Sequence, residues 1–317
     1  MSRRRFLIRR FIMLLCSLLV ASFVIFGSLY VEAGSPLAAL TGGRALPPSS
    51  IAVLDARYHL NESFIQQYWY WLSNALHGNL GISIEWRENV TTLMGNLTGT
   101  TVGLVAYAAL IIVVLGIGLG ILAALRPGLL DTSTLVVTAI TAALPSFVAA
   151  MVLVTVFAVE LHWFPALGNG TGLGSDIQHL TMPAIALAVS SLAIVARVTR
   201  AAVREEAGKE HVQTAISRGI PMRLILRRHI LRNAAIPITT ITGITIASLI
   251  AIDAVVETAF SLNGLGAFLV KAAEDKDLAV VQGISLVLVT AFVVVNMIVD
   301  ILYAVLDPRV SLGTTAQ

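Results

Sequence analysis

Charged residues are scarce in this chain. Asp, Glu, Lys and Arg make up only 12% of its 317 residues, whereas hydrophobic residues make up 57%. A soluble globular domain is typically about a quarter charged. The composition therefore excludes an ordinary soluble protein and predicts one that is embedded in a membrane.

Residues suited to metal, nucleotide or covalent chemistry are also scarce. The single cysteine, Cys16, excludes an internal disulfide, and the six histidines show no spacing typical of metal ligands. The sequence has no G-x-x-x-x-G-K-[ST] phosphate-binding loop, and no constellation of nucleophile and base indicates a membrane enzyme. We expect no metal site, no cofactor and no ATP site in this chain.

Six runs without Asp, Glu, Lys or Arg are long enough to cross a membrane. A transmembrane helix needs roughly 20 apolar residues to span about 30 Å of hydrocarbon, and lipid cannot satisfy exposed backbone polar groups, which favours helices. The fold class expected is therefore an all-α membrane protein with six transmembrane helices. The runs are residues 11–31, 97–125, 132–159, 177–196, 233–252 and 278–299.

The distribution of basic residues predicts that both termini are cytoplasmic. Most of the 21 Lys and Arg residues lie at the N-terminus and in residues 197–232, and such residues favour the cytoplasmic side of a membrane. A nucleic-acid partner is not expected, because its footprint would be a basic face on a soluble domain.

The chain divides into three parts. Residues 1–31 hold a basic N-terminus and the first helix, residues 32–96 form an extracytoplasmic segment, and residues 97–317 form a core of five helices with a cytoplasmic loop at 200–232. The start resembles a twin-arginine export signal, but a 21-residue run is longer than a signal core of about 7 to 15 residues. We expect the first helix to be retained.

Two patterns outside the loop indicate packing. Aromatic residues at helical spacing in residues 63–76 predict a helix that lies at the membrane interface or simply packs against its neighbours. Gly116 and Gly120 lie within an apolar run with no preceding strand, so they indicate close helix packing and not a nucleotide site.

A short helix is expected between the fourth and fifth runs. Residues 210–217 can form about two turns, and Gly219 and Pro221 are a stop signal. At helical spacing Val212, Ala215 and Ile216 are expected to share a face. Either that face docks into a partner's groove or the segment is a solvated connecting loop. The fifth helix is expected to begin at Pro237 or just before it.

The sequence around this helix resembles the EAA loop of ABC importer permeases, in the variant of the dipeptide and oligopeptide permease family, B-type subunit. The resemblance rests on Ala215 and Gly219, then Arg228-His229 and Leu231-Arg232-Asn233, and finally Pro237. Ile216-Ser217-Arg218 departs from the family's usual A-R-A-K-G pattern. The resemblance implies a type I ABC importer permease fold.

Three more elements resemble the same family, in the same order. Residues 78–83 are similar to G-D-L-G-x-S with Asn79 in place of the acid, and residues 256–266 are similar to V-E-T-V-F…P-G-L-G with Asn263 in place of proline. Asp300, Tyr303 and Asp307-Pro308-Arg309 are similar to the family's ending.

The resemblance implies a heteromeric complex. Its expected members are this chain, a second homologous permease, two ABC ATPase subunits that bind ATP and magnesium, and an extracytoplasmic substrate-binding protein. Residues that would couple to the ATPase are Glu210, His211, Val212, Ala215, Ile216, Arg218 and Gly219. Residues that would brace the loop are Arg228, His229, Arg232 and Asn233.

The translocation path is implied to lie at the interface with the second permease. The candidate residues are Thr239, Thr242, Thr245, Asp253 and Glu257. The threonines can equally hydrogen-bond within or between helices. Asp253, Glu257, Asp300 and Asp307 are expected to reach the membrane interface, where a proton relay and a structural or gating role both stay open.

The implied cargo is di- or oligopeptides, and relatives of the family also move nickel, glutathione or haem. A different class, an ion-coupled secondary transporter, would need paired charges or broken helices near the middle of the membrane. The six charge-free runs argue against that class.

Overall fold

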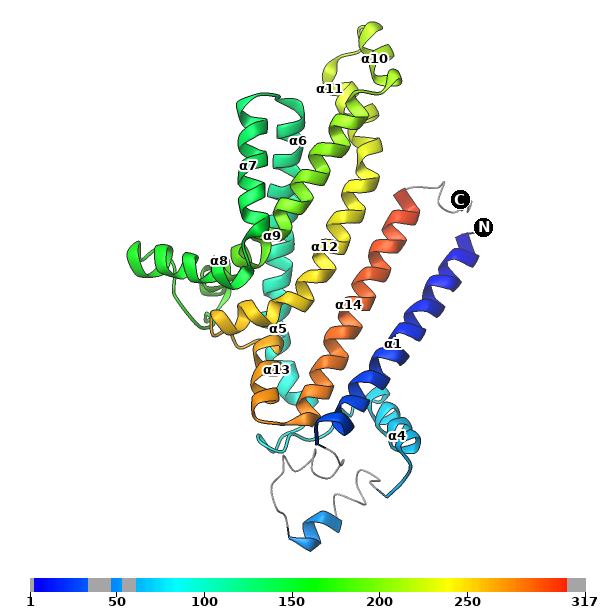
Figure 1. The fold of residues 1–317 in the computed structure, drawn as a ribbon, viewed down its shortest axis with the longest axis vertical. Helices are drawn as coiled ribbons and strands as arrows, with labels where there is room; N and C mark the ends of the chain where they lie inside the picture. Colours follow the sequence, from blue (N-terminus) through cyan, green and yellow to red (C-terminus); the bar gives the residue numbers. More distant parts are fainter. Residues whose placement is uncertain (1–2, 34–46, 53–60, 307–317) are drawn as a thin grey trace.

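The computed structural model describes residues 3–33, 47–52 and 61–306. Within these ranges the chain is helical, with no strand and only one isolated bridge, between Ile82 and Asn89. The expected all-α class is confirmed. Figure 1 shows an elongated bundle with α10 at one end and α4 toward the other; we call these the α10 end and the α4 end.

From α9 to α14 the helices follow one another with connections of a few residues. Three segments of the described chain have the wider π-helical winding, which arises where one extra residue is accommodated in a turn. The elements are α1 (Arg3–Ala33), α4 (Phe64–Leu76), α5 (Val90–Ile111), η1 (Ile112–Gly116), α6 (Ile117–Leu125), α7 (Leu129–Ala143), α8 (Ser146–Leu153), η2 (Val154–Glu160), α9 (Leu173–Ala207), α10 (Glu210–Ser217), α11 (Met222–Ile225), η3 (Leu226–Ile230), α12 (Leu231–Ala259), α13 (Leu265–Glu274) and α14 (Leu278–Leu306).

Five continuous helical segments of the described chain are long and apolar enough to span a membrane. The expected third span, residues 132–159, is not one helix. The chain bends by 104° between α7 and the α8–η2 segment. The break follows from Pro145, because a proline disfavours helical backbone in the residue before it, and Leu144 has an extended ψ of 115°. Counting the bent pair as one span gives six.

The expected start of the fifth helix at Pro237 is wrong. The helical segment runs from Met222 to Ala259, and Pro237 lies inside α12. The prediction treated the charge-free run as the whole helix, but a helix can continue past the membrane boundary with its charged residues in water. The same reason makes α9 extend to Ala207, beyond the run that ended at residue 196.

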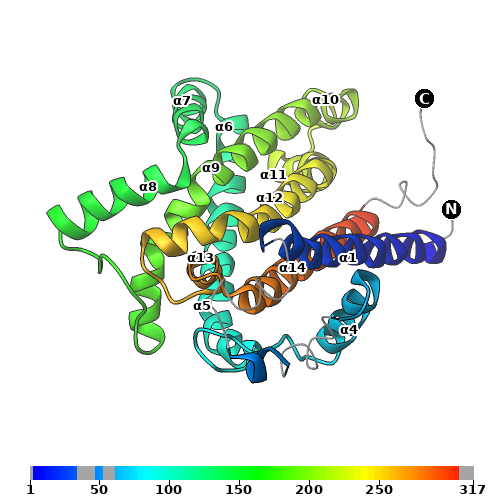
Figure 2. The ribbon, with the colours of Figure 1, turned by 60° about the horizontal axis from the view of Figure 1, so that its bottom comes forward.

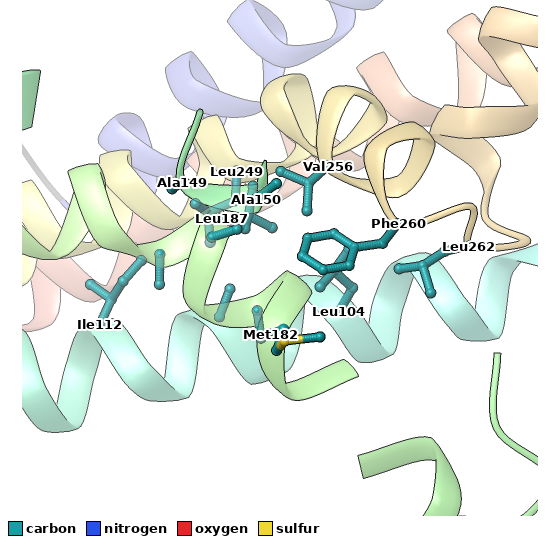
Figure 3. Packing of buried hydrophobic residues seen from close by; sticks show 14 of the residues in the cluster. Leu104, Ile112, Ala149, Ala150, Met182, Leu187, Leu249, Val256, Phe260 and Leu262 are labelled. Atoms are coloured by element: carbon teal, nitrogen blue, oxygen red, sulfur yellow. The ribbon is translucent and has the colours of Figure 1, made fainter. Parts of the chain in front are cut away.

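α9 is the central helix of the bundle, because it packs against α5, α6, α7, α8 and α12. Because its many alanines have short side chains, these neighbouring helices approach it closely. Figure 3 shows the resulting core, in which Phe260 lies among Leu104 of α5, Met182 of α9 and Val256 of α12. Fully burying one such side chain stabilises a fold by about 1.5–3 kcal/mol in water, whereas in lipid the gain comes from packing.

Gly116 of η1 and Gly120 of α6 confirm the expectation of close helix packing. A Cβ at Gly120 would lie 2.5 Å from the Cβ of Thr199 and 2.6 Å from the carbonyl oxygen of Ala196. A Cβ at Gly116 would lie 3.3 Å from Val195. Gly120 therefore sets the distance between α6 and α9.

α1 lies at the edge of the bundle, beside α14 and opposite the projecting α8 (Figures 1 and 2). Arg10 of α1 and Asp300 of α14 form an ion pair of 2.9 Å. Near the α4 end, Phe26 of α1 packs on Tyr68 of α4, and Ser22 and Tyr68 share a hydrogen bond of 2.8 Å. The aromatic residues of α4 thus include a packing face, while Trp69 is 56% exposed.

Asp277 attaches the segment before α5 to α14. Its carboxylate accepts hydrogen bonds from the Ser83 hydroxyl (2.6 Å) and from the backbone N–H of Ile84 (3.0 Å). Asp277 is 1% exposed. The residues of the expected G-x-L-G element, 78–83, are therefore part of the bundle at the α4 end. Asp307, Pro308 and Arg309 lie outside the described residues.

Candidate functional site

α10 is the outermost helix at its end of the bundle, beyond the ends of α9 and α12, as Figure 1 shows. Its bounds, Glu210–Ser217, are those expected from the sequence. Lys209 precedes it with extended backbone, and Gly219 ends it with φ +71°, a conformation that favours glycine. The N–H groups of Gly219 and Ile220 donate to the carbonyls of Ile216 and Ala215, which satisfies the helix C-terminus.

One side of α10 packs on the chain's own helices. Val212 and Ala215 are 1% and 4% exposed, in a cluster with Val203 of α9, Ile225 of α11 and Ile230 of η3. Ile216 is 47% exposed, so the expectation that it shares their face is wrong. Successive residues turn by about 100° around a helix, and this rotation carries Ile216 out of the narrow contact that Ala215 makes.

The other side of α10 is open. Its exposed residues mix polar and charged groups with Ile216, and they leave a surface on which a partner can dock. They are Glu210, His211, Gln213, Thr214, Ile216, Ser217 and, in the following turn, Arg218 and Gly219.

A buried carboxylate joins α10 to two long helices. Glu206, in the last turn of α9, is 5% exposed. Its oxygens lie 2.5 Å from Lys209 Nζ, 3.3 Å from His211 Nε2 and 2.7 Å from the side-chain amide of Asn233 in α12. The hydrogen bond to this carboxylate raises the pKa of the Lys209 ammonium, so Lys209 is charged at neutral pH.

The four expected bracing residues behave differently. Asn233 donates a hydrogen bond to Glu206 at the end of α9, and the ring of His229 lies 6.1 Å from that of His211, centroid to centroid. Arg228 and Arg232 are exposed, and neither makes an ion pair or a side-chain hydrogen bond within the described part of the chain. Their guanidinium groups are therefore available to a partner.

A second charged cluster at the α10 end was not anticipated from the sequence. Arg200 of α9 binds both carboxylate oxygens of Asp131 at the start of α7, and Arg204 lies 3.0 Å from the same carboxylate. Arg197 donates to Thr138 of α7 at 3.2 Å. The signal was the spacing of the three arginines, three and four residues apart, which places them on one side of a helix.

The candidate path residues lie within α12. Thr239 donates to the carbonyl of Ala235, one turn back in its own helix. Thr242 and Thr245 are each 6% exposed, so these threonines do not face open space in the isolated chain. The hydroxyl of Thr239 is therefore satisfied by a hydrogen bond within its own helix.

The two acids of α12 lie inside the protein and not on its surface. Asp253 and Glu257 are both fully buried, because α5 and α13 cover this end of α12. Glu257 accepts hydrogen bonds from the Thr101 hydroxyl (2.6 Å) and from the N–H of Ala267 (2.9 Å). The carboxylate oxygens of Asp253 have no hydrogen-bond partner among the described residues. Glu257 therefore holds the α12–α13 turn.

Comparisons with known proteins agree with one family along the chain. Residues 116–312 match the family described as binding-protein-dependent transport system inner membrane component, and residues 3–102 match the family of its N-terminal part. The oligopeptide transport system permease protein OppB of Escherichia coli (strain K12) is 33% identical over 308 residues, covering 96% of this chain and 99% of the relative. OppB of Salmonella typhimurium (strain LT2) matches with the same identity and coverage.

Proposed function

Because the chain belongs to the family of binding-protein-dependent transport system inner membrane components, we propose that it is the transmembrane subunit of an ATP-driven importer of di- and oligopeptides. It is a multi-pass protein of the inner membrane, and it is a permease component rather than a catalytic enzyme. The OppB relatives are oligopeptide transport system permease proteins, which supports the peptide cargo.

The α10 end faces the cytoplasm in this proposal. α1 begins and α14 ends toward that end (Figure 1), and the basic residues of α1, α9 and α11–η3 are concentrated there. Lys and Arg favour the cytoplasmic side. The α4 end then faces the side from which a substrate-binding protein delivers the peptide.

The observation that carries the proposal is the position of α10, whose outer side is exposed while its inner side is fixed to α9 and α12 through Glu206. An ATPase subunit that binds the exposed side of α10 can move α9 and α12 together. Arg218, Arg228 and Arg232, exposed beside α10, would meet acidic groups of that subunit.

Coupling of this kind is a shift between two arrangements of the helices. ATP binding must favour one arrangement of the ATPase dimer, and α10 must bind that arrangement better, or nothing is transmitted. Moving the equilibrium from 1:99 to 99:1 needs about 5.5 kcal/mol of differential binding. ATP and magnesium are held by the two ATPase subunits, and this chain supplies the mechanical link.

A second permease completes the membrane part of the complex. The α8–η2 segment projects from the bundle (Figures 1 and 2), and its large apolar side chains Phe147, Met151 and Val152 are at least half exposed. A homologous subunit packed near this side would close the path at the interface of the two permeases.

The experiment is uptake by a reconstituted complex. The chain is co-expressed with the second permease and both ATPases, and the complex is placed in proteoliposomes with the binding protein and a radiolabelled tripeptide. We expect uptake that requires ATP and stops when the ATPase is inactivated. Uptake driven by a proton or sodium gradient without ATP would instead indicate an ion-coupled transporter. ATP-dependent uptake of nickel, glutathione or haem but not of peptide would show that the importer carries that substrate instead of peptides.

A further inference from the structure

A groove of about 860 Å³ lies between α5 and the first turns of α9. Pockets that bind small ligands typically have about 300–1,000 Å³. Its α5 wall extends from Asn96 to Leu110, which corresponds to roughly 21 Å at a rise of 1.5 Å per residue. The groove therefore begins at the α4 end and runs along the bundle toward its middle.

The lining of the groove is mainly apolar, with polar side chains spaced along it. Asn96, Thr100 and Tyr107 of α5 face Asp176 and His179 of α9 across apolar and glycine surface. Thr100, Tyr107 and His179 lie within the apolar runs, and polar or ionisable residues in membrane segments almost always face a protein interior or a water-filled cavity. In the assembled complex this side of the chain is therefore expected to face a partner subunit or a water-filled path rather than lipid.

Asp176 gives the groove a negative charge. Among the described residues that line the groove it is the only Asp, Glu, Lys or Arg, and its carboxylate makes no ion pair or hydrogen bond with any of the described residues. His179 Nδ1 lies 2.9 Å from the carbonyl oxygen of Ser175, and a carbonyl can only accept, so Nδ1 carries the proton. Asp176 thus offers an acceptor to a ligand.

The mouth of the groove is held in place by Asn169. Its side-chain amide donates to the Thr100 hydroxyl (2.7 Å), and its carbonyl oxygen accepts from the backbone N–H of Asn263 (2.7 Å). A proline at position 263 would remove this donor. The loop after η2 is thereby fixed to both α5 and the α12–α13 turn, so the groove is largely preformed.

We propose that this groove is a subsite for the positively charged amine of a peptide, with Asp176 as the group that attracts it. The inference rests on the proposed function, and it names the chemistry by which the permease itself selects cargo. A preformed carboxylate in a narrow wet groove concentrates cations and repels anions. The apolar and glycine surface between the polar groups leaves room for the peptide backbone and small side chains.

The first test measures the charge of the groove without any substrate. In the assembled complex Cys16 is replaced by serine, and Ala106, an exposed lining residue, is replaced by cysteine. The rates of modification by a trimethylammonium and by a sulfonate methanethiosulfonate reagent are compared. Asp176→Asn is expected to lower the cation-to-anion rate ratio about fivefold, as a unit charge acting on the two reagents across roughly 8 Å of water would.

The control is Glu160→Gln, an exposed acid at the end of η2, which is expected to leave the ratio unchanged. An unlabelled Ala106→Cys protein would show that the groove is not wet, and an equal ratio with and without Asp176→Asn would show that Asp176 does not set its charge. Either result overturns the inference.

The second test separates the sources of the amine. Trialanine, N-acetyl-trialanine and N-acetyl-trialanine with a C-terminal lysine are used to slow the labelling and as uptake substrates. Protection by the first and third peptides, lost with Asp176→Asn, is the expected result. Protection by the first alone assigns the site to the peptide N-terminus, and equal protection by all three overturns the charge-based selection. Absence of ATP-dependent peptide uptake refutes the proposed function, whereas normal uptake with an unchanged labelling ratio refutes only the subsite.

Discussion

The side-chain amide of Asn233 donates a 2.7 Å hydrogen bond to the buried carboxylate of Glu206, and this contact joins the first turn of α12 to the last turn of α9. The same carboxylate holds Lys209, the residue that precedes α10, at 2.5 Å. Movement of the start of α10 away from α9 would therefore break the ion pair between Lys209 and Glu206, whose carboxylate is also bound to α12.

Replacement of Glu206 by leucine is expected to uncouple ATP hydrolysis from uptake. Hydrogen bonds to charged groups contribute about 1.5–3 kcal/mol each, and a loss of about 1.4 kcal/mol is a factor of ten. We expect the ratio of peptide imported to ATP hydrolysed to fall about tenfold or more in proteoliposomes. Glu205→Leu is the matched control, because its side chain is 78% exposed and 3.9 Å from Lys209. Equal ratios in the two variants would contradict the role of Glu206.

Replacement of Gly219 by proline is expected to disconnect α10 from the turn that follows it. Gly219 has φ +71°, whereas proline fixes φ near −65° and lacks the N–H that Gly219 donates to Ile216 at 2.9 Å. Uptake should fall while basal ATP hydrolysis persists. Gly208→Ala, at the other end of α10 with φ −81°, should retain most of the uptake. Normal uptake with Gly219→Pro would show that this turn does not transmit movement.

The sequence predicted the bounds of α10 because a glycine and a proline end it, and such signals act locally. It could not separate Glu205 from Glu206, which are chemically alike and adjacent. Only the packing of α9 against α12 decides which of them is buried. Pro145 is a local signal for the break between α7 and α8. Because proline is uncharged, a run defined by the absence of charged residues continues through it. The prediction of an apolar side of α10 was correct in part, because Val212 and Ala215 are buried but Ile216 is exposed.

Disruption of the pair between Asp131 and Arg200 is expected to loosen α7 from α9 at the α10 end. Asp131→Arg should lower the Tm of the purified complex by a few degrees, because it places a third positive charge beside Arg200 and Arg204. The double variant Asp131→Arg with Arg200→Asp restores opposite charges and should recover part of the loss. Additive losses in a double-mutant cycle would show that the two side chains do not interact.

Gly120→Ala is expected to destabilise the complex, and Gly118→Ala is its matched control. A methyl group at Gly120 would meet Thr199 and the backbone of Ala196, whereas nothing lies within 4 Å of a Cβ at Gly118. Overpacking costs about 1–3 kcal/mol, while an unobstructed Gly→Ala change in a helix stabilises it by roughly 0.5–1 kcal/mol. Thermal unfolding of the purified complex should therefore move in opposite directions for these neighbours. A shift of the same sign in both would mean that the close approach of α6 and α9 does not depend on the absence of a side chain at Gly120.

Glu257 and Asp253 provide a final contrast within α12, since both are fully buried but only Glu257 has hydrogen-bond partners in the described chain. Removing one partner of a buried hydrogen bond leaves the other unsatisfied, so Glu257→Leu should lower the Tm by several degrees. Asp253→Leu removes a carboxylate without a partner, and replacing such a group by an apolar one costs little or stabilises. Thr101→Val should lower the Tm less when Glu257 is already leucine, because their shared bond is gone. If Asp253→Leu abolishes uptake while the complex stays folded, Asp253 acts in transport, and a structural account of this pair is insufficient.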